Sequence, residues 1–578
     1  MPEPEPQKAR EPPLWERWPR LSLLCVSLLV YAGNLGGPLL FDDAQSITEN
    51  TTLAPLGSFA WLMPPRETPV AGRPLPNLTF ALNHALFGDS PFAYHLVNLL
   101  FHLAVSWLGF SLVRITLVHG RVPESLRERA PALAFAAALL FAVHPVGVEL
   151  VLYATQRTES LLAIFYLGAL LLVAHAAVSG RCSRGVLALA VLCTVLGAGS
   201  KEVFATAPLC ALFYDRAFFA GGFLPALRAR KALYAALSVG YLPIVLLQRT
   251  DPRPGSVRFF ELDYLVAQAR IVPGYLGHAL WPAHPQLDYG MLVPQDAHGA
   301  WPWIALCLLG VMVATWAAFA RPRAGFLGVC VLGVLAPSSS LFSVHTEVGA
   351  ERRIYLPLVA IAAYVVVALV LALRRLPLSQ SAERAFPTLL CAGAVIGLVL
   401  SARAYAESFA TAELAWRTAV QARPDNPRAH YNLAETLRRY GRPDLAEPEY
   451  RAALRCFEGY ADAHSNLASV LAARGALPEA LRHAARAAQL APRDARTRYD
   501  YGVSLAISGD LQGAVRELTE ASTLAPNDAT PRIKLAQALL LLGEHAAAAP
   551  HVAWLKAHAP NAPATRALVE RLAQLEGR

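Results

Sequence analysis

The sequence predicts an all-α protein in which a polytopic membrane domain precedes a C-terminal solenoid of repeated helices. Hydrophobic residues make up 55% of the 578-residue chain and charged residues only 16%, where a soluble protein carries roughly a quarter charged residues. Apolar runs that suit membrane crossing recur to about residue 402. From about residue 412 a 34-residue repeat replaces them.

The net charge of +9 does not indicate a nucleic-acid partner. Lys and Arg lie in short clusters between apolar runs, which is how membrane proteins encode their topology. The eight cysteines form no CxxC pair and no metal-ligand spacing. We therefore expect membrane lipids as partners, no nucleic acid and no cysteine-based metal site.

Residues 1–20 are polar and Pro-rich, so we expect a disordered cytoplasmic N-terminus. The run 21–40 is interpreted as a first span, with a cleaved signal peptide as the alternative. A membrane domain over 21–403 would hold about eleven spans, near 21–40, 92–113, 131–152, 159–178, 186–199, 203–214, 232–248, 301–320, 325–344, 354–373 and 386–402.

The runs 186–199 and 203–214 are short, and Ser200-Lys201-Glu202 separates them. Counting them as two helices places the basic loops, 216–231 among them, on the cytoplasmic side, as the positive-inside tendency requires. The segment 263–281 is interpreted as an interfacial helix. The Ala-, Leu-, Arg- and Pro-rich composition favours a bacterial inner-membrane protein with its C-terminal region in the periplasm.

The repeat is visible in three sets of residues 34 positions apart. Pro492, Pro526 and Pro560 form a further set. Small residues at fixed places and a terminal proline are the signature of tetratricopeptide repeats, whose concave surface most often binds peptide segments. We expect a repeat domain over 404–578, in which 412–422 begins the array and 561–578 caps it. The three sets are Leu433, Leu467, Tyr501 and Leu535; Gly441, Gly475, Gly509 and Gly543; and Ala446, Ala480, Ala514 and Ala548.

Polar residues near the outer ends of the predicted spans could carry chemistry. Asp42 and Asp43 end the first run, and an ionised carboxylate there either marks the membrane edge or has a task. A carboxylate can deprotonate an acceptor hydroxyl, and Lys or Arg can stabilise a leaving phosphate. Interhelical salt bridges are the alternative interpretation. By the predicted topology all these residues face one side of the membrane.

Several short motifs occur in an order that resembles a known family: Phe41-Asp42-Asp43, Gly72-Arg73-Pro74, Tyr94-His95-Leu96-Val97-Asn98, His144-Pro145, Arg157-Thr158-Glu159, Ser200-Lys201-Glu202, Leu287-Asp288-Tyr289 and Glu351-Arg352-Arg353. With the repeats that follow, the chain from residue 21 resembles the transmembrane and tetratricopeptide-repeat-containing O-mannosyltransferases. The repeat array is shorter than in the eukaryotic members, and a bacterial relative need not use mannose or a protein acceptor.

The resemblance implies a GT-C-like membrane glycosyltransferase that uses a polyprenyl-phosphate-linked sugar and inverts the anomeric centre. It places the catalytic base at Asp42 or Asp43. By the same resemblance, Lys201, Arg157 and Arg352 contact the donor phosphate. Residues that bind the acceptor or orient these groups are Glu149, Glu159, Glu202, His144, Arg73 and Asp288.

We therefore expect transfer of a mannose-like sugar to a hydroxyl of a protein acceptor on the outer side, beneath a repeat solenoid that binds this acceptor. One alternative is a lipid-linked glycan ligase or polymerase, and another is a non-enzymatic membrane-anchored repeat scaffold. Asp42, Asp43 and Glu149 could hold a divalent cation, although no ligand spacing argues for a metal. The sequence does not specify the sugar, the acceptor, the anomeric outcome or the oligomeric state.

Overall fold

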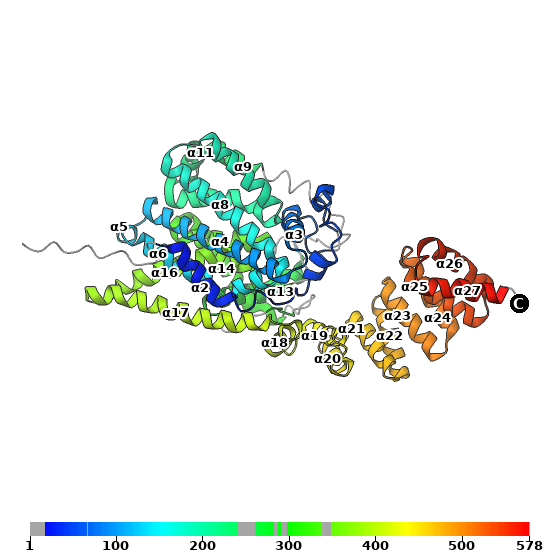
Figure 1. Cartoon of the computed structure of the whole chain (residues 1–578). Coiled ribbons are helices and arrows are strands. Elements are labelled where there is room, and N and C mark those ends of the chain that lie inside the picture. The colour runs from blue at the N-terminus through cyan, green and yellow to red at the C-terminus, as the bar shows by residue number, and fades with distance from the viewer. Residues whose placement is uncertain are drawn as a thin grey trace, which may run out of the picture. The chain divides into compact units, whose positions relative to one another are not determined.

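The computed structural model describes residues 18–65, 68–239, 261–282, 287–290, 298–337, 339, 348–377 and 379–576. The chain divides into two compact units, Met1–Ala415 and Trp416–Arg578 (Figure 1). The described residues form helices and turns without a strand, which confirms the all-α prediction. The predicted disorder over 1–20 falls almost entirely outside the described residues.

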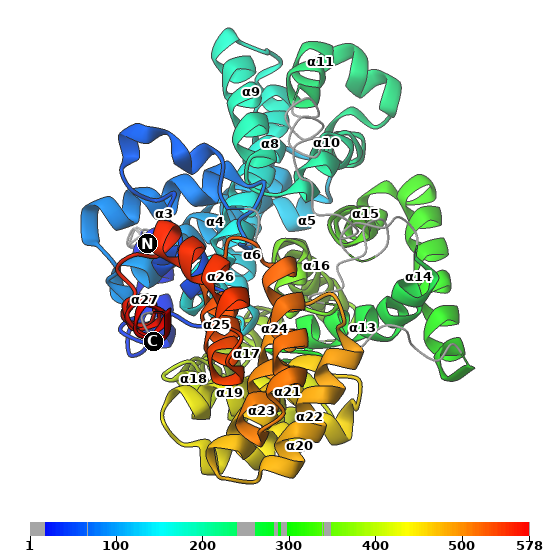
Figure 2. The same cartoon turned by 90° about the vertical axis from the view of Figure 1, so that its right-hand side faces the viewer.

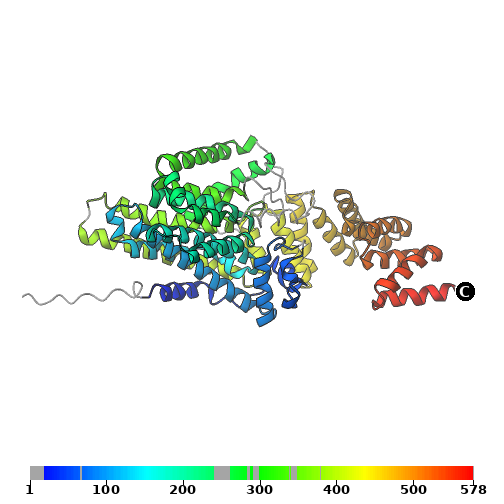
Figure 3. The same ribbon diagram turned by 90° about the horizontal axis from the view of Figure 1, so that it is seen from above.

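The first unit is a helix bundle, and Figures 1 and 3 show most of its long helices lying side by side along a common direction. One apolar core joins side chains from α4, α8, α10, α13, α15 and α16. The helices are α2 Pro19–Tyr31, α3 Pro74–Phe87, α4 Pro91–His119, α5 Glu124–Arg127, α6 Ala130–Ala142, α7 Val146–Leu152, α8 Arg157–Ser179, α9 Arg184–Ala198, α10 Ala207–Asp215, α11 Phe223–Ser238, α13 Leu262–Leu280, α14 Trp301–Ala320, α15 Pro322–Ala336, α16 Tyr355–Leu373 and α17 Gln380–Ser408.

Six helices among the described residues are long and apolar enough to cross a membrane, or seven if the bent pair α6 and α7 is one span. The chain is a multi-pass membrane protein, but the predicted count of eleven spans is not confirmed. Part of the predicted spans 232–248 and 325–344 lies outside the described residues. The pair α6 and α7 bends by 61° at the segment that contains Pro145, because proline cannot donate the next helical hydrogen bond.

The first apolar run forms a shorter helix than the sequence suggested. Helix α2 has 13 residues and ends at Tyr31, because Gly33, Asn34, Gly36 and Gly37 favour turns over a continued helix. The two short runs do form separate helices, α9 and α10, as expected. Helix α13 occupies the segment that we interpreted as interfacial.

Three of the polar motifs lie at short 3-10 turns that lead into apolar helices. These turns are η4 Ala154–Gln156 before α8, η5 Glu202–Thr206 before α10, and η9 Glu351–Ile354 before α16. The first backbone N–H groups of a helix have no partner within the helix, so acidic and polar side chains are favoured there. This accounts for Glu159, Glu202 and Glu351, and each of these acids has a basic residue beside or close to it in sequence.

The second unit contains four helix pairs and a final helix, which confirms the tetratricopeptide-type array. Figure 2 labels the successive pairs. The pairs are α19 Pro427–Arg439 with α20 Pro443–Cys456, α21 Ala461–Ala473 with α22 Leu477–Leu490, α23 Ala495–Ser508 with α24 Leu511–Leu524, and α25 Ala529–Leu542 with α26 His545–His558. Helix α18 Ala412–Ala422 precedes them and α27 Pro563–Glu576 follows.

The repeated small residues have separate physical roles. Gly441, Gly475, Gly509 and Gly543 adopt φ between 72° and 93° in the turn within each pair, a conformation that is costly for a residue with a β-carbon. The alanines of the repeat are at most 1% exposed and let the paired helices approach closely. Both features follow from the 34-residue period.

A further in-phase feature links the two helices of each repeat. A basic residue on the first helix bonds the backbone carbonyl oxygen six residues earlier and faces a residue 19 positions later on the second helix. In the fourth repeat, the two residues are close enough that the positive charge of Arg532 contributes to lowering the pKa of His551. The pairs are His430 with Glu449, His464 with His483, Arg498 with Glu517, and Arg532 with His551.

Candidate active site

The Asp43 carboxylate is bonded within the protein. Its Oδ2 accepts hydrogen bonds from the backbone N–H groups of Leu40 at 3.0 Å and Ala154 at 3.1 Å. Its Oδ1 accepts from the backbone N–H of Thr155 at 2.7 Å and from the Thr155 hydroxyl at 2.6 Å. Asp43 is 0% exposed, and burial raises its pKa to about 6 although these donors oppose the shift. Asp43 thus fastens the loop after α2 to the beginning of η4.

Asp42 lies in a different environment from its neighbour. It is partly exposed, and its Oδ2 accepts a 2.7 Å hydrogen bond from the Tyr153 hydroxyl. The Phe41 ring meets the Tyr153 ring edge-on, with centroids 5.2 Å apart. Phe41 also has φ of 54°, in the left-handed region that non-glycine residues rarely adopt. Tyr153 and this turn hold Asp42 at the edge of the site.

Arg352 connects three further segments to Tyr153. Its guanidinium carbon lies 5.9 Å from the centroid of the Tyr153 ring, within reach of a cation–π interaction. Its Nη1 donates to Glu149 Oε2 at 3.3 Å, and Glu149 Oε1 accepts from the Tyr405 hydroxyl at 3.0 Å. The side chains of Arg352 and Glu149 are 8% and 1% exposed. The loop after α2, α7, η9 and α17 therefore meet around one buried ion pair.

Glu351 extends this cluster toward α13. It accepts hydrogen bonds from His278 Nδ1 at 2.5 Å and from the Tyr289 hydroxyl at 3.3 Å. Asp288 precedes Tyr289, is 4% exposed, and accepts a 3.0 Å hydrogen bond from the backbone N–H of Gly290. Asp288 is thus linked to the cluster through its neighbour Tyr289.

Lys201 and Arg73 form two ion pairs near the beginning of α8. Lys201 Nζ binds Glu159 Oε1, and these side chains are 11% and 9% exposed. Arg73 Nη2 lies 3.3 Å from Glu202 Oε2, with side-chain exposures of 26% and 36%. Each predicted cation is thus matched by a predicted acid.

Arg157 is fully buried, and protein groups occupy its guanidinium. Nε donates to Asn98 Oδ1 at 2.7 Å, Nη1 to Thr79, and Nη2 to the Tyr94 carbonyl at 3.1 Å. Its Cζ lies 4.6 Å from the centroid of the Phe80 ring. In this arrangement Arg157 joins α3, α4 and α8, and the structure does not bring it to an open surface.

His144 occupies the bend between α6 and α7. Its Nδ1 accepts a 3.2 Å hydrogen bond from the backbone N–H of Val146, and the residue is 4% exposed. This contact satisfies one of the first N–H groups of α7, which the bend leaves without a helical partner. His144 thus supports the bend between α6 and α7 and also lies against Ala279 of α13.

The segment 149–159 organises the predicted site residues. Five of its residues, spaced two or four positions apart, each contact a group from a different part of the chain. Asp42 and Lys201 therefore contact residues only six positions apart, at the same end of α8. The contacts are Glu149 with Arg352, Tyr153 with Asp42, Thr155 with Asp43, Arg157 with Asn98, and Glu159 with Lys201.

Sequence reasoning missed Tyr153, Tyr405 and His278. Tyr153 immediately follows α7 and lies between the predicted Glu149 and Arg157, so its place between two predicted site residues could have drawn attention to it. Tyr405 and His278 carry no such local signal, because their partners Glu149 and Glu351 are far away in sequence.

Among the residues that the structure describes, no group of three or more His, Cys, Asp or Glu side chains could hold a metal ion. Asp42, Asp43 and Glu149 do not form such a group. Asp42 and Asp43 are held by Tyr153 and by the Ala154–Thr155 backbone, respectively.

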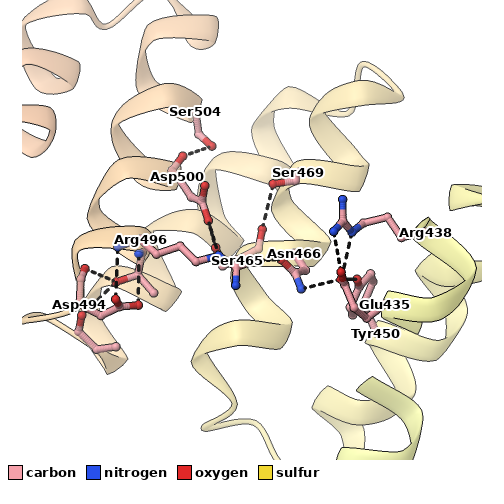
Figure 4. A network of polar contacts seen from close by, with 12 residues as sticks. Glu435, Arg438, Tyr450, Ser465, Asn466, Ser469, Asp494, Arg496, Asp500 and Ser504 are labelled. Carbon is pink, nitrogen blue, oxygen red and sulfur yellow. Dashed lines mark hydrogen bonds and ion pairs between the residues drawn. The ribbon is translucent and has the colours of Figure 1, made fainter. Parts of the chain in front are cut away.

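The repeat unit carries a polar stripe of its own across α19, α21 and α23 (Figure 4). Asn466 donates to the Tyr431 hydroxyl at 3.1 Å and to Glu435 at 3.3 Å, and accepts from Arg496 at 2.8 Å. Asp500 accepts from the Ser465 hydroxyl. Arg438 and Arg496 are 41% and 55% exposed, so both ends of the stripe can reach a partner.

Comparison with known proteins gives a consistent set of relatives. A sequence model of the tetratricopeptide repeat matches residues 401–461 and 441–495. The Caenorhabditis elegans protein O-mannosyl-transferase F38B6.6 is 26% identical over 76% of this chain and 63% of its own length. Drosophila melanogaster protein O-mannosyl-transferase Tmtc3 is 36% identical over 28% of this chain and 19% of its own length. Human protein O-mannosyl-transferase TMTC4 is 32% identical over 26% of this chain and 22% of its own length.

The chain spans less than two thirds of the length of each of these relatives. Solved structures match about a third of the chain or less. A tetratricopeptide-repeat protein with an unusual peptide-binding site, YrrB, covers 28% of this chain and 93% of its own, at 17% identity and a TM-score of 0.25. PilF from Pseudomonas aeruginosa covers 32% of this chain and 82% of its own, at 22% identity and a TM-score of 0.27.

Proposed function

We propose that this protein is an integral membrane glycosyltransferase that moves mannose, or a closely similar sugar, from a polyprenyl-phosphate carrier to a hydroxyl group of a protein acceptor. The observation that carries the proposal is the partly exposed Asp42 carboxylate, held by Tyr153 beside the buried Arg352–Glu149 pair. The relatives named protein O-mannosyl-transferases give the sugar and the class of acceptor.

In this proposal Asp42 is the general base and Asp43 a structural carboxylate. Asp42 accepts the proton of a Ser or Thr hydroxyl as its oxygen attacks the anomeric carbon. The bond between that carbon and the phosphate oxygen breaks, and the carrier phosphate leaves with the electron pair. Attack opposite to the leaving group inverts the anomeric centre. Partial exposure favours Asp42, because a base must reach the acceptor, whereas Asp43 is 0% exposed.

Charge on the leaving phosphate needs stabilisation by cations that are already in place. Arg352 is the best candidate, because Glu149 and the Tyr153 ring fix its guanidinium next to the Asp42 group. Lys201 would contribute a second positive charge at the same end of α8, with Glu159 orienting it. Arg157 would act by holding α3, α4 and α8 together, since protein atoms occupy its donors.

The repeat unit would bind the polypeptide acceptor. Its polar stripe offers donors and acceptors to an extended peptide backbone, with Arg438 and Arg496 exposed for acidic side chains. We place the repeats on the periplasmic side of a bacterial inner membrane, because the basic clusters between the spans favour that orientation.

The test uses the purified full-length protein in lipid nanodiscs with polyprenyl-phosphate-mannose and Ser/Thr-containing peptides. We expect a mass gain of one hexose on the peptide, and no gain with the Asp42→Asn variant. Transfer only from oligosaccharide-lipid donors would instead identify a glycan ligase. Absence of transfer from every donor, together with rescue of a gene deletion by one span plus residues 412–578, would identify a scaffold and reject the proposal.

A further inference from the structure

A cavity of about 660 Å³ lies within the first unit, apart from the Asp42 cluster. Helices α4, α8, α10, α15 and α16 contribute its walls, which are almost entirely apolar. The volume is in the range of small-molecule binding sites. Representative wall residues are Leu117, Leu170, Phe218, Ala363, Val367 and Leu371.

Two arginines line the cavity at one end. Arg321 is the single residue in the turn between α14 and α15, and Arg323 is the second residue of α15; both are exposed. The Arg321 guanidinium carbon lies 5.7 Å from the centroid of the Trp316 ring. The turn is fixed in two ways: Arg216 donates to the carbonyl oxygens of Ala318 and Phe319, and the Tyr364 hydroxyl bonds the carbonyl of Arg323. These hydrogen bonds fix the backbone from which the two guanidinium groups extend.

The arginines lie further along α16 than Arg352: the Arg323 carbonyl oxygen accepts a hydrogen bond from Tyr364, eight residues or roughly 12 Å along the helix from Leu356. The cavity is lined by α16 from Leu356, which follows η9 and Arg352, to Leu371. At 1.5 Å per residue these positions are roughly 22 Å apart along the helix. A donor with its phosphate at Arg352 would leave Arg321 and Arg323 without a phosphate. The two arginines can then bind a second anionic group.

The part of the wall nearest the arginines suits one lipid chain. On α16 it runs from Ala363 to Leu371, roughly 12 Å of helix, and one leaflet of hydrocarbon is about 15 Å deep. Helix α14, next to the turn, exposes nearly all of its apolar side chains, as a lipid-facing helix does. Figure 2 shows this helix beside α15. The site is thus positioned to receive a lipid from the bilayer.

We propose that this cavity binds one acyl chain of an anionic glycerophospholipid, with the lipid phosphate held by Arg321 and Arg323. The apolar walls exclude a polar ligand, and the paired positive charges select an anionic headgroup over a zwitterionic one. This site is separate from the proposed donor site and does not depend on the sugar-transfer reaction.

The test is native mass spectrometry of the full-length protein in detergent, titrated with phosphatidylglycerol, phosphatidylcholine or a polyprenyl phosphate. We expect one equivalent of phosphatidylglycerol to bind and phosphatidylcholine to bind at least roughly tenfold more weakly. The double variant Arg321→Gln/Arg323→Gln should lose roughly tenfold in phosphatidylglycerol affinity. Ala363→Phe, which fills the cavity, should abolish binding and leave the circular dichroism spectrum unchanged.

Arg181→Gln/Arg184→Gln is the matched control, because it removes the same charge from exposed positions that do not line the cavity. It should bind phosphatidylglycerol as the parent protein does. Equal losses in both double variants, or equal affinity for both phospholipids, would overturn the proposal. Displacement of phosphatidylglycerol by polyprenyl phosphate with retained dependence on Ala363 would also overturn it, by making the cavity a carrier-lipid site. If Ala363→Phe does not fold, Val367→Phe gives the same readout.

Discussion

The hydroxyl of Tyr153 donates a 2.7 Å hydrogen bond to Asp42 Oδ2, whereas the adjacent Asp43 accepts hydrogen bonds from backbone and side-chain groups of the same short turn. Two consecutive carboxylates are thereby separated into a partly exposed one and a fully buried one. This separation gives the Asp42-Asp43 pair two roles that mutation can distinguish.

Asp42→Asn should abolish sugar transfer and leave the melting temperature nearly unchanged, because it removes the base while the amide oxygen can still accept the hydrogen bond from Tyr153. Asp43→Asn should instead destabilise the protein by about 2–3 kcal/mol, since the amide nitrogen would face backbone donors. Thermal unfolding in detergent and a transfer assay on the folded fraction would measure both. A folded, active Asp42→Asn protein would exclude Asp42 as the base.

Tyr153→Phe should reduce kcat roughly tenfold and change KM little, because loss of one hydrogen bond of about 1–1.5 kcal/mol leaves Asp42 less well oriented. The ring remains, so its contacts with Phe41 and Arg352 persist. Tyr166→Phe is the matched control, since its hydroxyl binds Thr206 elsewhere in the bundle. An equal loss of kcat in both variants would indicate a general packing effect.

Arg352 and Glu149 should behave as a coupled pair. Each single change to Gln leaves a buried charge without its partner and should cost about 3–5 kcal/mol of stability. The double variant should recover part of that loss, yet remain inactive if Arg352 binds the donor phosphate. A double-mutant cycle on unfolding, combined with donor binding, separates these two effects.

Arg157→Lys should lower stability, because an ammonium cannot replace a guanidinium that donates to Asn98, Thr79 and Tyr94 from three nitrogens. We expect a loss of about 3 kcal/mol or more. Donor affinity of the folded fraction, measured by a binding titration, should stay within about twofold. A specific loss of donor affinity without destabilisation would return Arg157 to the phosphate-binding role.

The histidine pair of the second repeat should make the repeat unit sensitive to acid. His464 and His483 have Nδ1 atoms 2.8 Å apart, and burial lowers the pKa of both below the usual 6.5. The stability that they contribute is present above pH 6.5 and is lost as the pH falls toward their lowered pKa values.

His483→Glu should reverse this dependence. It recreates in the second repeat the His430–Glu449 pair of the first, where the carboxylate raises the histidine pKa. The stability from such a pair is present below pH 6.5 and is lost as the pH rises through the raised pKa. Hydrogen-exchange protection of α21 and α22 in the full-length protein, compared at about pH 5.5 and about pH 7.5, measures the reversal. His483→Gln, which cannot titrate, should only weaken the dependence.

The 34-residue period was sufficient to predict most of the repeat unit. Gly441 and its equivalents, the buried alanines and helix α18 all occur where the spacing places them, because each repeat is a local unit whose turns and close contacts are set by nearby residues. The facing pairs, such as His430 with Glu449, also follow the period, although they become visible only when both helices are seen together.

The membrane unit was less predictable in its details. Apolar length alone suggested a first span over 21–40, whereas the helix ends at Tyr31. The polar motifs were found because charge is rare and costly among apolar runs. Their pairing was not predictable, since Tyr405 binds Glu149 across 256 positions, and no local spacing records such a contact.

The sequence by itself determined the all-α class, the apolar helices, the repeats and the set of charged motifs, because periodicity and hydropathy are local properties of the chain. Only the tertiary structure decided which of those charged side chains are buried and which are exposed. It buried Asp43 and Arg157 among protein partners and left Asp42 partly exposed beside Tyr153. Burial depends on which distant segments pack against a side chain. In this protein the segment 149–159 contacts both acids and contains Arg157, so its packing sets the exposure of all three residues.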